Sequence, residues 1–281
     1  MQTGMLPRIM AVLLAVCGLG ACTTIVVNES TMIPSFGRGQ LLGQLPNGHE
    51  LVEHEFERSD GERAYGLAVT ADADLPSILV YGGNMQSADG SIHRVVDNLR
   101  HLDANLFFFD RRGQGRSTGS PGVEQGMDDA VEVLDYVREQ VAGPIILHGF
   151  SLGGFEAAHV AGHRAVDAMV LEATATNVDD FARQAVPWFA KPFIRIQVAD
   201  ELRGFDNRDI LAEYDGPLLL IAGGNDRQTS PRMMKDLYEA SPSAQKQLVL
   251  VKNAHHNNVM RREQARESYA RFLRESGLVQ D

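Results

Sequence analysis

Apolar and amphipathic stretches alternate along most of the chain. Short apolar runs, such as residues 77–81 and 144–147, have the length and composition of strands that are buried on both faces. Between such runs, apolar residues recur every three or four positions, as from residue 92 to residue 102, which is the period of an amphipathic helix. The pattern predicts strands at 49–58, 64–70, 77–81, 105–109, 144–147, 168–171, 217–221 and 247–251, and helices at 92–102, 127–141, from 151, 231–240 and 262–275.

The order of these segments indicates the class of fold. Strands buried on both faces and separated by helices form parallel sheets that helices cover on both sides. The first two strands are an exception, because the turn sequence Ser59-Asp60-Gly61 between them predicts an antiparallel pair. With 281 residues, 44% of them hydrophobic, the chain has enough apolar material for one large core. We therefore expect one α/β domain over residues 48–281, with a mostly parallel sheet of about eight strands.

A long interval, about residues 174–214, interrupts the alternation. Connections of this length are uncommon in compact domains unless they have a role, so we expect a short helical cap inserted in the domain. The apolar side chains of this insertion either line a substrate pocket or only fasten the insertion to the core. They are Trp188, Phe189, Phe193 and Ile194.

The N-terminus is predicted to be a signal peptide over residues 1–21. A single arginine precedes an apolar stretch at 9–19, which is too short for a transmembrane helix and typical of a secretory signal. The sequence Leu19-Gly20-Ala21-Cys22 resembles the lipobox of bacterial lipoproteins, which implies cleavage before Cys22 and lipidation of its thiol. The alternative is an ordinary signal peptide with an incidental cysteine. Cys17 would leave with the signal, so the mature chain would have no disulfide.

Residues 22–47 have little periodicity and are expected to form a tether, in which residues 25–27 could add an edge strand. Several acyl chains on one residue anchor a protein durably. The resemblance to lipoproteins, with Thr23 after the cysteine, implies a place in the bacterial cell envelope, on the outer membrane facing the periplasm.

Charge narrows the range of partners. The formal net charge is −11 and no run of Lys or Arg is longer than two residues, so the sequence lacks the basic clusters that are typical of a nucleic-acid-binding protein. We find no cluster of residues with the spacing of metal ligands. The chemistry is therefore expected to need no metal or cofactor, and the sequence leaves the oligomeric state open.

The segment between the strand at 144–147 and the following helix has the pattern of a nucleophile elbow. Gly149-Phe150-Ser151-Leu152-Gly153 matches G-x-S-x-G, in which the serine stands at the apex of a sharp strand-to-helix turn. Residues two before and two after the apex would collide unless they are small, and both are glycine here. Ser151 is therefore the candidate nucleophile.

A serine nucleophile needs a base to accept its proton and an acid to orient that base. Asp226 follows the strand at 217–221, and the pair His255-His256 follows the strand at 247–251, so both lie where parallel strands end at one edge of the sheet. The order serine, acid, histidine is the one expected for this topology. His148 is expected to be a packed residue at a strand end.

The tetrahedral intermediate also needs backbone donors for its oxyanion. One is expected at Leu152, directly after the nucleophile and at the positive end of a helix. The other is expected in the loop Gly82-Gly83-Asn84-Met85, where glycines let the backbone approach a ligand. Asn84 is the first choice and Met85 the alternative; Met85 and His255 are also candidates for the substrate pocket.

With these motifs assembled, residues 48–278 resemble bacterial α/β-hydrolase-fold serine hydrolases. The segment from Asp110 to Pro121 is similar to the D-x-R-G-x-G-x-S-x-G segment of that family, where it shapes the floor of the site without being catalytic. The resemblance favours His256 as the base, since His255 takes the place of a glycine in the family pattern, and Asp226 as the acid, with Glu172 as the alternative.

The resemblance implies a function as well as a fold. Its members are described as esterases, lipases or thioesterases, so the chain is expected to cleave a small or lipid-like acyl ester or thioester through an acyl-enzyme. The alternatives are acyl transfer or peptide hydrolysis on the same triad, and a non-catalytic envelope lipoprotein that uses the fold for binding.

Overall fold

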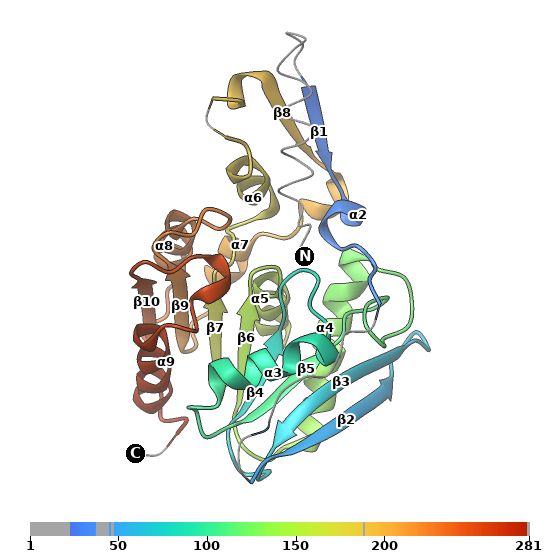
Figure 1. Ribbon diagram of the computed structural model, residues 1–281, viewed down its shortest axis with the longest axis vertical. Coiled ribbons are helices and arrows are strands. Elements are labelled where there is room, and N and C mark those ends of the chain that lie inside the picture. Colours follow the sequence, from blue (N-terminus) through green and yellow to red (C-terminus); the bar gives the residue numbers. More distant parts are fainter. Residues whose placement is uncertain (1–22, 38–44, 46–47, 188, 280–281) are drawn as a thin grey trace.

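An eight-stranded sheet organises the protein. The computed structural model describes residues 23–37, 45, 48–187 and 189–279 (Figure 1). Neighbouring strands run parallel except at β3, which is antiparallel to both β5 and β2. The mostly parallel sheet predicted from the sequence is confirmed. In spatial order the strands are β10 (Lys246–Val251), β9 (Leu218–Gly223), β7 (Ala168–Glu172), β6 (Ile145–Phe150), β4 (Ser77–Tyr81), β5 (Asn105–Phe109), β3 (Arg63–Thr70) and β2 (Glu50–Glu57).

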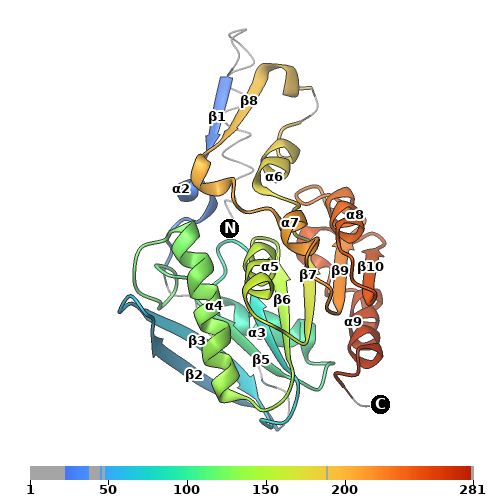
Figure 2. The same cartoon turned by 180° about the vertical axis from the view of Figure 1, so that it is seen from behind.

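Helices cover both faces of the sheet. One face packs on α3 and α9, and the opposite face, seen in Figure 2, packs on α4, α5 and α8. Successive side chains of a strand point to opposite faces, so Ile78 and Val80 join the first core while Leu79 and Tyr81 join the second. This explains why the strands read as unbroken apolar runs. The helices are α3 (Ala88–Leu99), α4 (Val123–Gln140), α5 (Gly153–His163), α8 (Pro231–Ala240) and α9 (Glu263–Glu275).

The insertion between β7 and β9 contains a strand as well as helices. In β8 (Ile194–Val198) the sequence IRIQV alternates apolar and polar residues, which is the period of a half-buried strand. The insertion therefore differs from the purely helical cap that its length suggested. Its other elements are α6 (Val178–Gln184), η1 (Lys191–Phe193), η2 (Asp200–Leu202) and α7 (Asn207–Leu211).

The first described segment pairs with this insertion. Strand β1 (Thr23–Val27) runs parallel to β8, from Thr23 beside Ile194 to Val27 beside Val198, and Figure 1 shows the two strands standing beyond the carboxyl ends of the main sheet. Residues 25–27 thus form a strand, but in a separate two-stranded sheet.

The short helix α2 (Glu29–Met32) that follows β1 lies against α4. The Glu29 carboxylate accepts a hydrogen bond of 2.8 Å from the backbone amide of Val123, at the first turn of α4. The carboxylate accepts from an amide that has no partner within the helix, and its negative charge is stabilised by the positive end of the helix dipole. Val27 and Met32 also pack with Phe155 of α5 in a third apolar cluster. The N-terminal segment is therefore part of the folded body beside the insertion.

Residues 1–22, which include the predicted signal peptide and Cys22, lie outside the described part of the chain, as do 38–44 and 46–47 of the expected tether. Among the described helices, none has both the length and the apolar composition needed to span a bilayer.

Candidate active site

Ser151 stands at the turn between β6 and α5. Its backbone has φ = 53°, a left-handed conformation that is uncommon for a residue with a side chain. Three hydrogen bonds hold this conformation: the Ser151 amide donates to the Glu172 carbonyl (2.9 Å), and the Ser151 carbonyl accepts from the Gly154 amide (3.0 Å) and the Thr174 hydroxyl (2.7 Å). The surroundings therefore stabilise the strained geometry that presents the Ser151 side chain at the sheet edge.

The two glycines of the motif are required by close backbone contacts. A Cβ atom on Gly149 would lie 2.5 Å from the carbonyl oxygen of Gly153, and one on Gly153 would overlap the carbonyl oxygen of Tyr81. These distances are far below van der Waals contact, so alanine at either position would displace the turn. Both positions must therefore be small, as the motif predicts.

The structure brings Ser151, His256 and Asp226 together. His256 Nε2 lies 3.0 Å from Ser151 Oγ, and His256 Nδ1 lies 2.9 Å from Asp226 Oδ2. Asp226 follows β9, and His256 begins the short turn η3 (His256–Asn258) after β10, so each reaches the site from a strand end. His256 and Asp226 are buried, while Ser151 is half-buried. A serine hydroxyl, an imidazole and a carboxylate are thus connected in one hydrogen-bonded chain, which is the geometry that a catalytic triad requires.

A fourth residue, Thr229, completes the support of Asp226 and was missed in the sequence. Its amide and that of Gln228 donate to Asp226 Oδ1 at 3.1 and 2.8 Å, and its hydroxyl lies 2.9 Å from Asp226 Oδ2 and 2.8 Å from the carbonyl oxygen of Ala173. An aspartate followed two and three residues later by amides that bond its carboxylate is a local turn motif. A threonine three positions after the candidate acid was the signal available in the sequence.

Each alternative to the acid and the base has another partner. Glu172 lies 3.1 Å from His148 Nε2, and both are buried, so this carboxylate is engaged away from His256. His255 is exposed, and its Nδ1 lies 3.2 Å from the carbonyl oxygen of Asn225. Asp226 and His256 therefore form the pair that contacts Ser151.

The predicted oxyanion donors lie on two adjoining segments. Strands β4 and β6 are neighbours, with Tyr81 beside Gly149, so the loop after β4 meets the elbow after β6. The backbone amides of Asn84, of its alternative Met85 and of Leu152 have no hydrogen-bond acceptor within the described ranges. Unpaired amides in the loop after β4 and directly after Ser151 are the type of donor that stabilises an oxyanion.

Arg111 holds the loop after β4 in place. Its guanidinium donates to the carbonyl oxygens of Gly82 and Gly83, the latter at 3.0 Å, and forms an ion pair with Glu156 of α5, with Nη2 2.8 Å from Oε2. The side chain therefore links the loop that carries Asn84 to the helix that begins after Ser151. The family motif had indicated a floor-forming segment from Asp110 to Pro121, but not this link.

Asp110, beside Arg111, is buried and accepts hydrogen bonds from the amides of Ala88 (2.6 Å) and Arg116 (2.8 Å). Burial raises the pKa of Asp110 to about 6, because it penalises the charged form more than these donors favour it. Its carboxylate also fills the space that a side chain on Gly115 would need.

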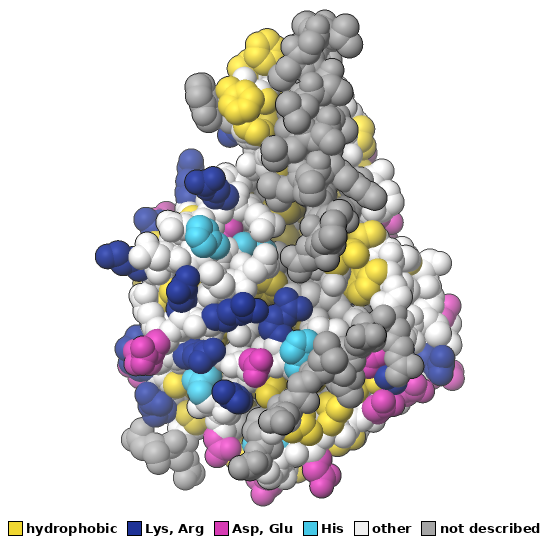
Figure 3. Space-filling model, in the orientation of Figure 1, with side chains coloured by type: hydrophobic (Ala, Val, Ile, Leu, Met, Phe, Trp, Pro, Cys, Tyr) yellow, Lys and Arg dark blue, Asp and Glu magenta, His cyan; other side chains and the backbone are white. Residues whose placement is uncertain are grey.

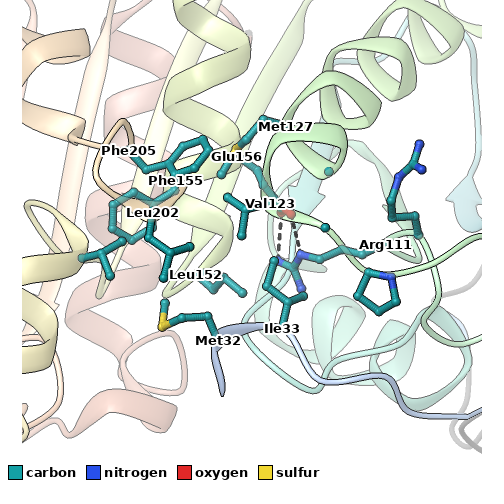
Figure 4. Close-up of a pocket in the computed structure, with 15 residues that line it drawn as sticks. Met32, Ile33, Arg111, Val123, Met127, Leu152, Phe155, Glu156, Leu202 and Phe205 are labelled. Carbon is teal, nitrogen blue, oxygen red and sulfur yellow. Dashed lines mark hydrogen bonds and ion pairs between the residues drawn. The ribbon is translucent and has the colours of Figure 1, made fainter. Parts of the chain in front are cut away.

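An apolar pocket lies beside Leu152 (Figure 4). Its volume is about 30 Å³, and the N-terminal segment, α4, α5 and the insertion all contribute walls. The Arg111–Glu156 ion pair closes one side of it. The labelled apolar residues of its lining are Met32, Ile33, Val123, Met127, Leu152, Phe155, Leu202 and Phe205.

The described residues that the sequence suggested for a substrate pocket do not line this apolar pocket. Met85 and Phe189 are 55% and 58% exposed, and neither lines the apolar pocket. Trp188 lies outside the described residues. His255 lines a separate, polar hollow next to His256. Across the described ranges, no group of three or more His, Cys, Asp or Glu side chains is arranged to hold a metal ion.

The parallel sheet, the turn at Ser151 and the Asp226 and His256 side chains at the ends of later strands together have the arrangement of the α/β-hydrolase fold. Residues 77–215 match the family described as "Serine aminopeptidase, S33". The solved structure of the Pyrococcus furiosus esterase Pf2001 has the same fold, with a TM-score of 0.67 and 18% identity, over 85% of this chain and 99% of the esterase.

Relatives in other organisms match most of the chain. The α/β-hydrolase domain-containing protein WAV2 of Arabidopsis thaliana is 28% identical over 69% of this chain and 68% of its own length. The protein YfhR of Escherichia coli K12 is 26% identical over 89% of this chain and 87% of its own length. These matches support the interpretation that the protein is a hydrolase. The segment that matches the family, residues 77–215, includes Ser151, whereas Asp226 and His256 lie beyond it.

Proposed function

We propose that this α/β hydrolase cleaves a carboxylic ester or thioester through an acyl-enzyme. The observation that carries the proposal is the hydrogen-bonded chain from Ser151 Oγ through His256 to Asp226. His256 Nε2 takes the Ser151 proton as Oγ attacks the carbonyl carbon, and then gives it to the leaving oxygen or sulfur. Water, activated by the same nitrogen, then releases the acid and restores Ser151.

The roles of the surrounding groups follow from the charges that develop. Asp226 stabilises the imidazolium formed when His256 holds the extra proton. The amides of Asn84 and Leu152 donate to the oxyanion of the tetrahedral intermediate. The apolar side chains beside Leu152 favour a short apolar acyl group, because the proposed oxyanion donor Leu152 also lines this pocket of about 30 Å³.

Turnover of 4-nitrophenyl acetate and butanoate tests the proposal. Purified protein should release 4-nitrophenol, Ser151→Ala should reduce kcat at least a thousandfold, and Ser59→Ala, at an exposed serine of the turn between β2 and β3, should retain the wild-type rate. Release that persists in Ser151→Ala, in protein shown to be folded by circular dichroism, would contradict it.

Peptide hydrolysis is the second candidate, because the matching family is described as serine aminopeptidases. Amides differ from esters in their poorer leaving group, so the same triad serves both only if the leaving nitrogen is well positioned beside His256. Comparing amino-acid 4-nitroanilides with the 4-nitrophenyl esters distinguishes them: faster relative turnover of the anilides would favour the peptidase.

We also propose, from the sequence alone, that the protein is anchored at the bacterial cell envelope. Lipidation of Cys22 would place the enzyme at the bacterial cell envelope, one residue before β1 begins. Membrane fractions should lose the protein when Cys22 is replaced by serine, and unchanged partitioning of Cys22→Ser would refute lipidation.

A further inference from the structure

A second hollow, of about 410 Å³, opens beside His256. Its charged lining residues are Arg94 of α3, Arg227 after β9 and Arg261 after η3, and neither Asp nor Glu lines it. His255, three asparagines and a glutamine complete the wall with His256. Figure 3 shows Lys and Arg side chains gathered around histidines on this face. A concentration of cationic side chains is unexpected on a protein whose formal net charge is −11.

The three guanidinium groups of this hollow form no ion pair with a carboxylate in the described part of the chain. Other buried or half-buried arginines of the protein are paired with carboxylates: Arg112 is bonded to Asp129 and Asp60, and Arg116 is bonded to Asp89. The cations around His256 are thus available to a ligand, whereas these arginines are occupied within the fold.

Arg94 is the member of this cluster that solvent screens least. It is half-buried, and its guanidinium donates a long hydrogen bond of 3.4 Å to Ser91. Burial lowers the pKa of Arg94, and the like charge of Arg261 lowers it further, while Glu172 opposes them. Glu172 is itself bonded to His148. An anion in the hollow would supply the compensating charge that these side chains lack.

The position of His256 relates the hollow to the reaction. The imidazole that accepts the Ser151 proton returns it to the leaving group, so the leaving group lies within reach of Nε2. The apolar pocket, by contrast, includes Leu152, and the two pockets share no lining residue. An ester bound at Ser151 would therefore direct its alcohol portion towards the arginines and its acyl portion towards Leu152.

We propose that the hollow binds a carboxylate or phosphate on the alcohol portion of the substrate, so that the preferred ester has an anionic leaving group. In the reaction the bond from the carbonyl carbon to Ser151 Oγ forms, the bond to the alcohol oxygen breaks, and His256 protonates that oxygen. The alcohol leaves with its carboxylate or phosphate unchanged. This inference rests on the proposed ester hydrolysis.

Matched esters test the inference. We expect kcat/KM for 4-carboxyphenyl butanoate to exceed that for 4-carbamoylphenyl butanoate by about tenfold at low salt, because the carboxylate adds an attraction to the cluster. The ratio should fall as ionic strength rises. Arg227→Gln combined with Arg261→Gln should bring the ratio towards one. Both esters are measured on one preparation, so partial unfolding of a variant cancels in the ratio.

A control and a second pair complete the experiment. Arg271→Gln, at an exposed arginine of α9 bonded only to Ser268 among the described groups, should keep the wild-type ratio. The pair 1-butanoylglycerol 3-phosphate and 1-butanoylglycerol asks whether phosphate is favoured over carboxylate. A wild-type ratio near one in both pairs, or a preference unaffected by the double substitution, would overturn the anion site. Absence of turnover for every ester would instead overturn the proposed function.

Discussion

Asp226 meets His256 through one carboxylate oxygen, Oδ2, which lies 2.9 Å from Nδ1 of the imidazole. The other oxygen accepts the amides of Gln228 and Thr229, so the carboxylate is fixed before any substrate binds. Acceptance of a hydrogen bond at Oδ2 keeps the proton of neutral His256 on Nδ1 and leaves Nε2 free to receive the proton of Ser151.

Asp226→Asn tests this orientation. An amide nitrogen at the Oδ2 position would donate to the imidazole and favour the wrong tautomer, so kcat for 4-nitrophenyl butanoate should fall by about 10³ to 10⁴ with little change in fold. Asp215→Asn, at an exposed residue before β9, is the matched control and should retain activity. A loss of less than tenfold in Asp226→Asn would show that Asp226 does not orient the base.

The two adjacent histidines should differ sharply. His256→Ala removes the group 3.0 Å from Ser151 Oγ and should abolish ester turnover, whereas His255→Ala should keep most of the turnover of neutral esters. His255 points to the carbonyl of Asn225 and lines the cationic hollow. Steady-state assays of both variants with 4-nitrophenyl acetate check this, and the reverse result would mean that the base is His255.

Arg111 is expected to act as a positioning residue for the oxyanion loop. Arg111→Gln breaks its ion pair with Glu156 and its contacts with the carbonyls of Gly82 and Gly83, so kcat should fall about 10- to 100-fold while KM changes little. Arg111→Lys should restore part of the lost kcat, because lysine keeps the charge but not the fork of donors.

A purely structural role for Arg111 would give a different result. It would lower the unfolding temperature without separating kcat from KM in the protein that stays folded. Arg63→Gln, which removes an exposed ion pair with Glu55, is the control for loss of a surface arginine.

Asp110 provides a test of stability against pH. Its pKa is raised from 3.8 to about 6, so the folded chain binds more protons than the unfolded chain between these values. Its contribution to the free energy of unfolding must therefore decrease as pH rises from about 4 to about 6. Asp110→Asn lacks this titrating group. The other titratable groups are common to both proteins, so their contributions largely cancel when the free energies of unfolding are compared at each pH. The stability of the wild type relative to the variant should fall by at most about 3 kcal/mol over this window, measured by urea unfolding; a flat or rising difference would contradict the raised pKa.

Much of the fold could be predicted because it depends on local periodicity. Buried strands such as β4 read as apolar runs, and amphipathic helices such as α3 read as three- and four-residue spacings. The placement of Ser151, Asp226 and His256 near one another followed from the rule that parallel strands end at one edge. Each of these inferences needs only the sequence within an element and the order of elements.

The features that could not be predicted depend on contacts between distant segments. The alternation in β8 is visible, but its parallel pairing with β1 joins residues about 170 positions apart, and nothing local selects that partner. The link from Arg111 to Glu156 and Gly82 also forms only in the folded chain. The gathering of Arg94, Arg227 and Arg261 around His256 is of the same kind, since one helix and two loops far apart in the sequence supply them.

The nucleophilic role of Ser151 is tested most directly by covalent labelling of the purified protein with a fluorophosphonate, followed by mass spectrometry of the peptide that contains Ser151. We expect one adduct, on Ser151, that is absent from Ser151→Ala and forms far more slowly in His256→Ala, because Oγ reacts only when Nε2 takes its proton. An adduct on another residue, or no adduct on folded wild-type protein, would contradict the proposal that Ser151 is the nucleophile.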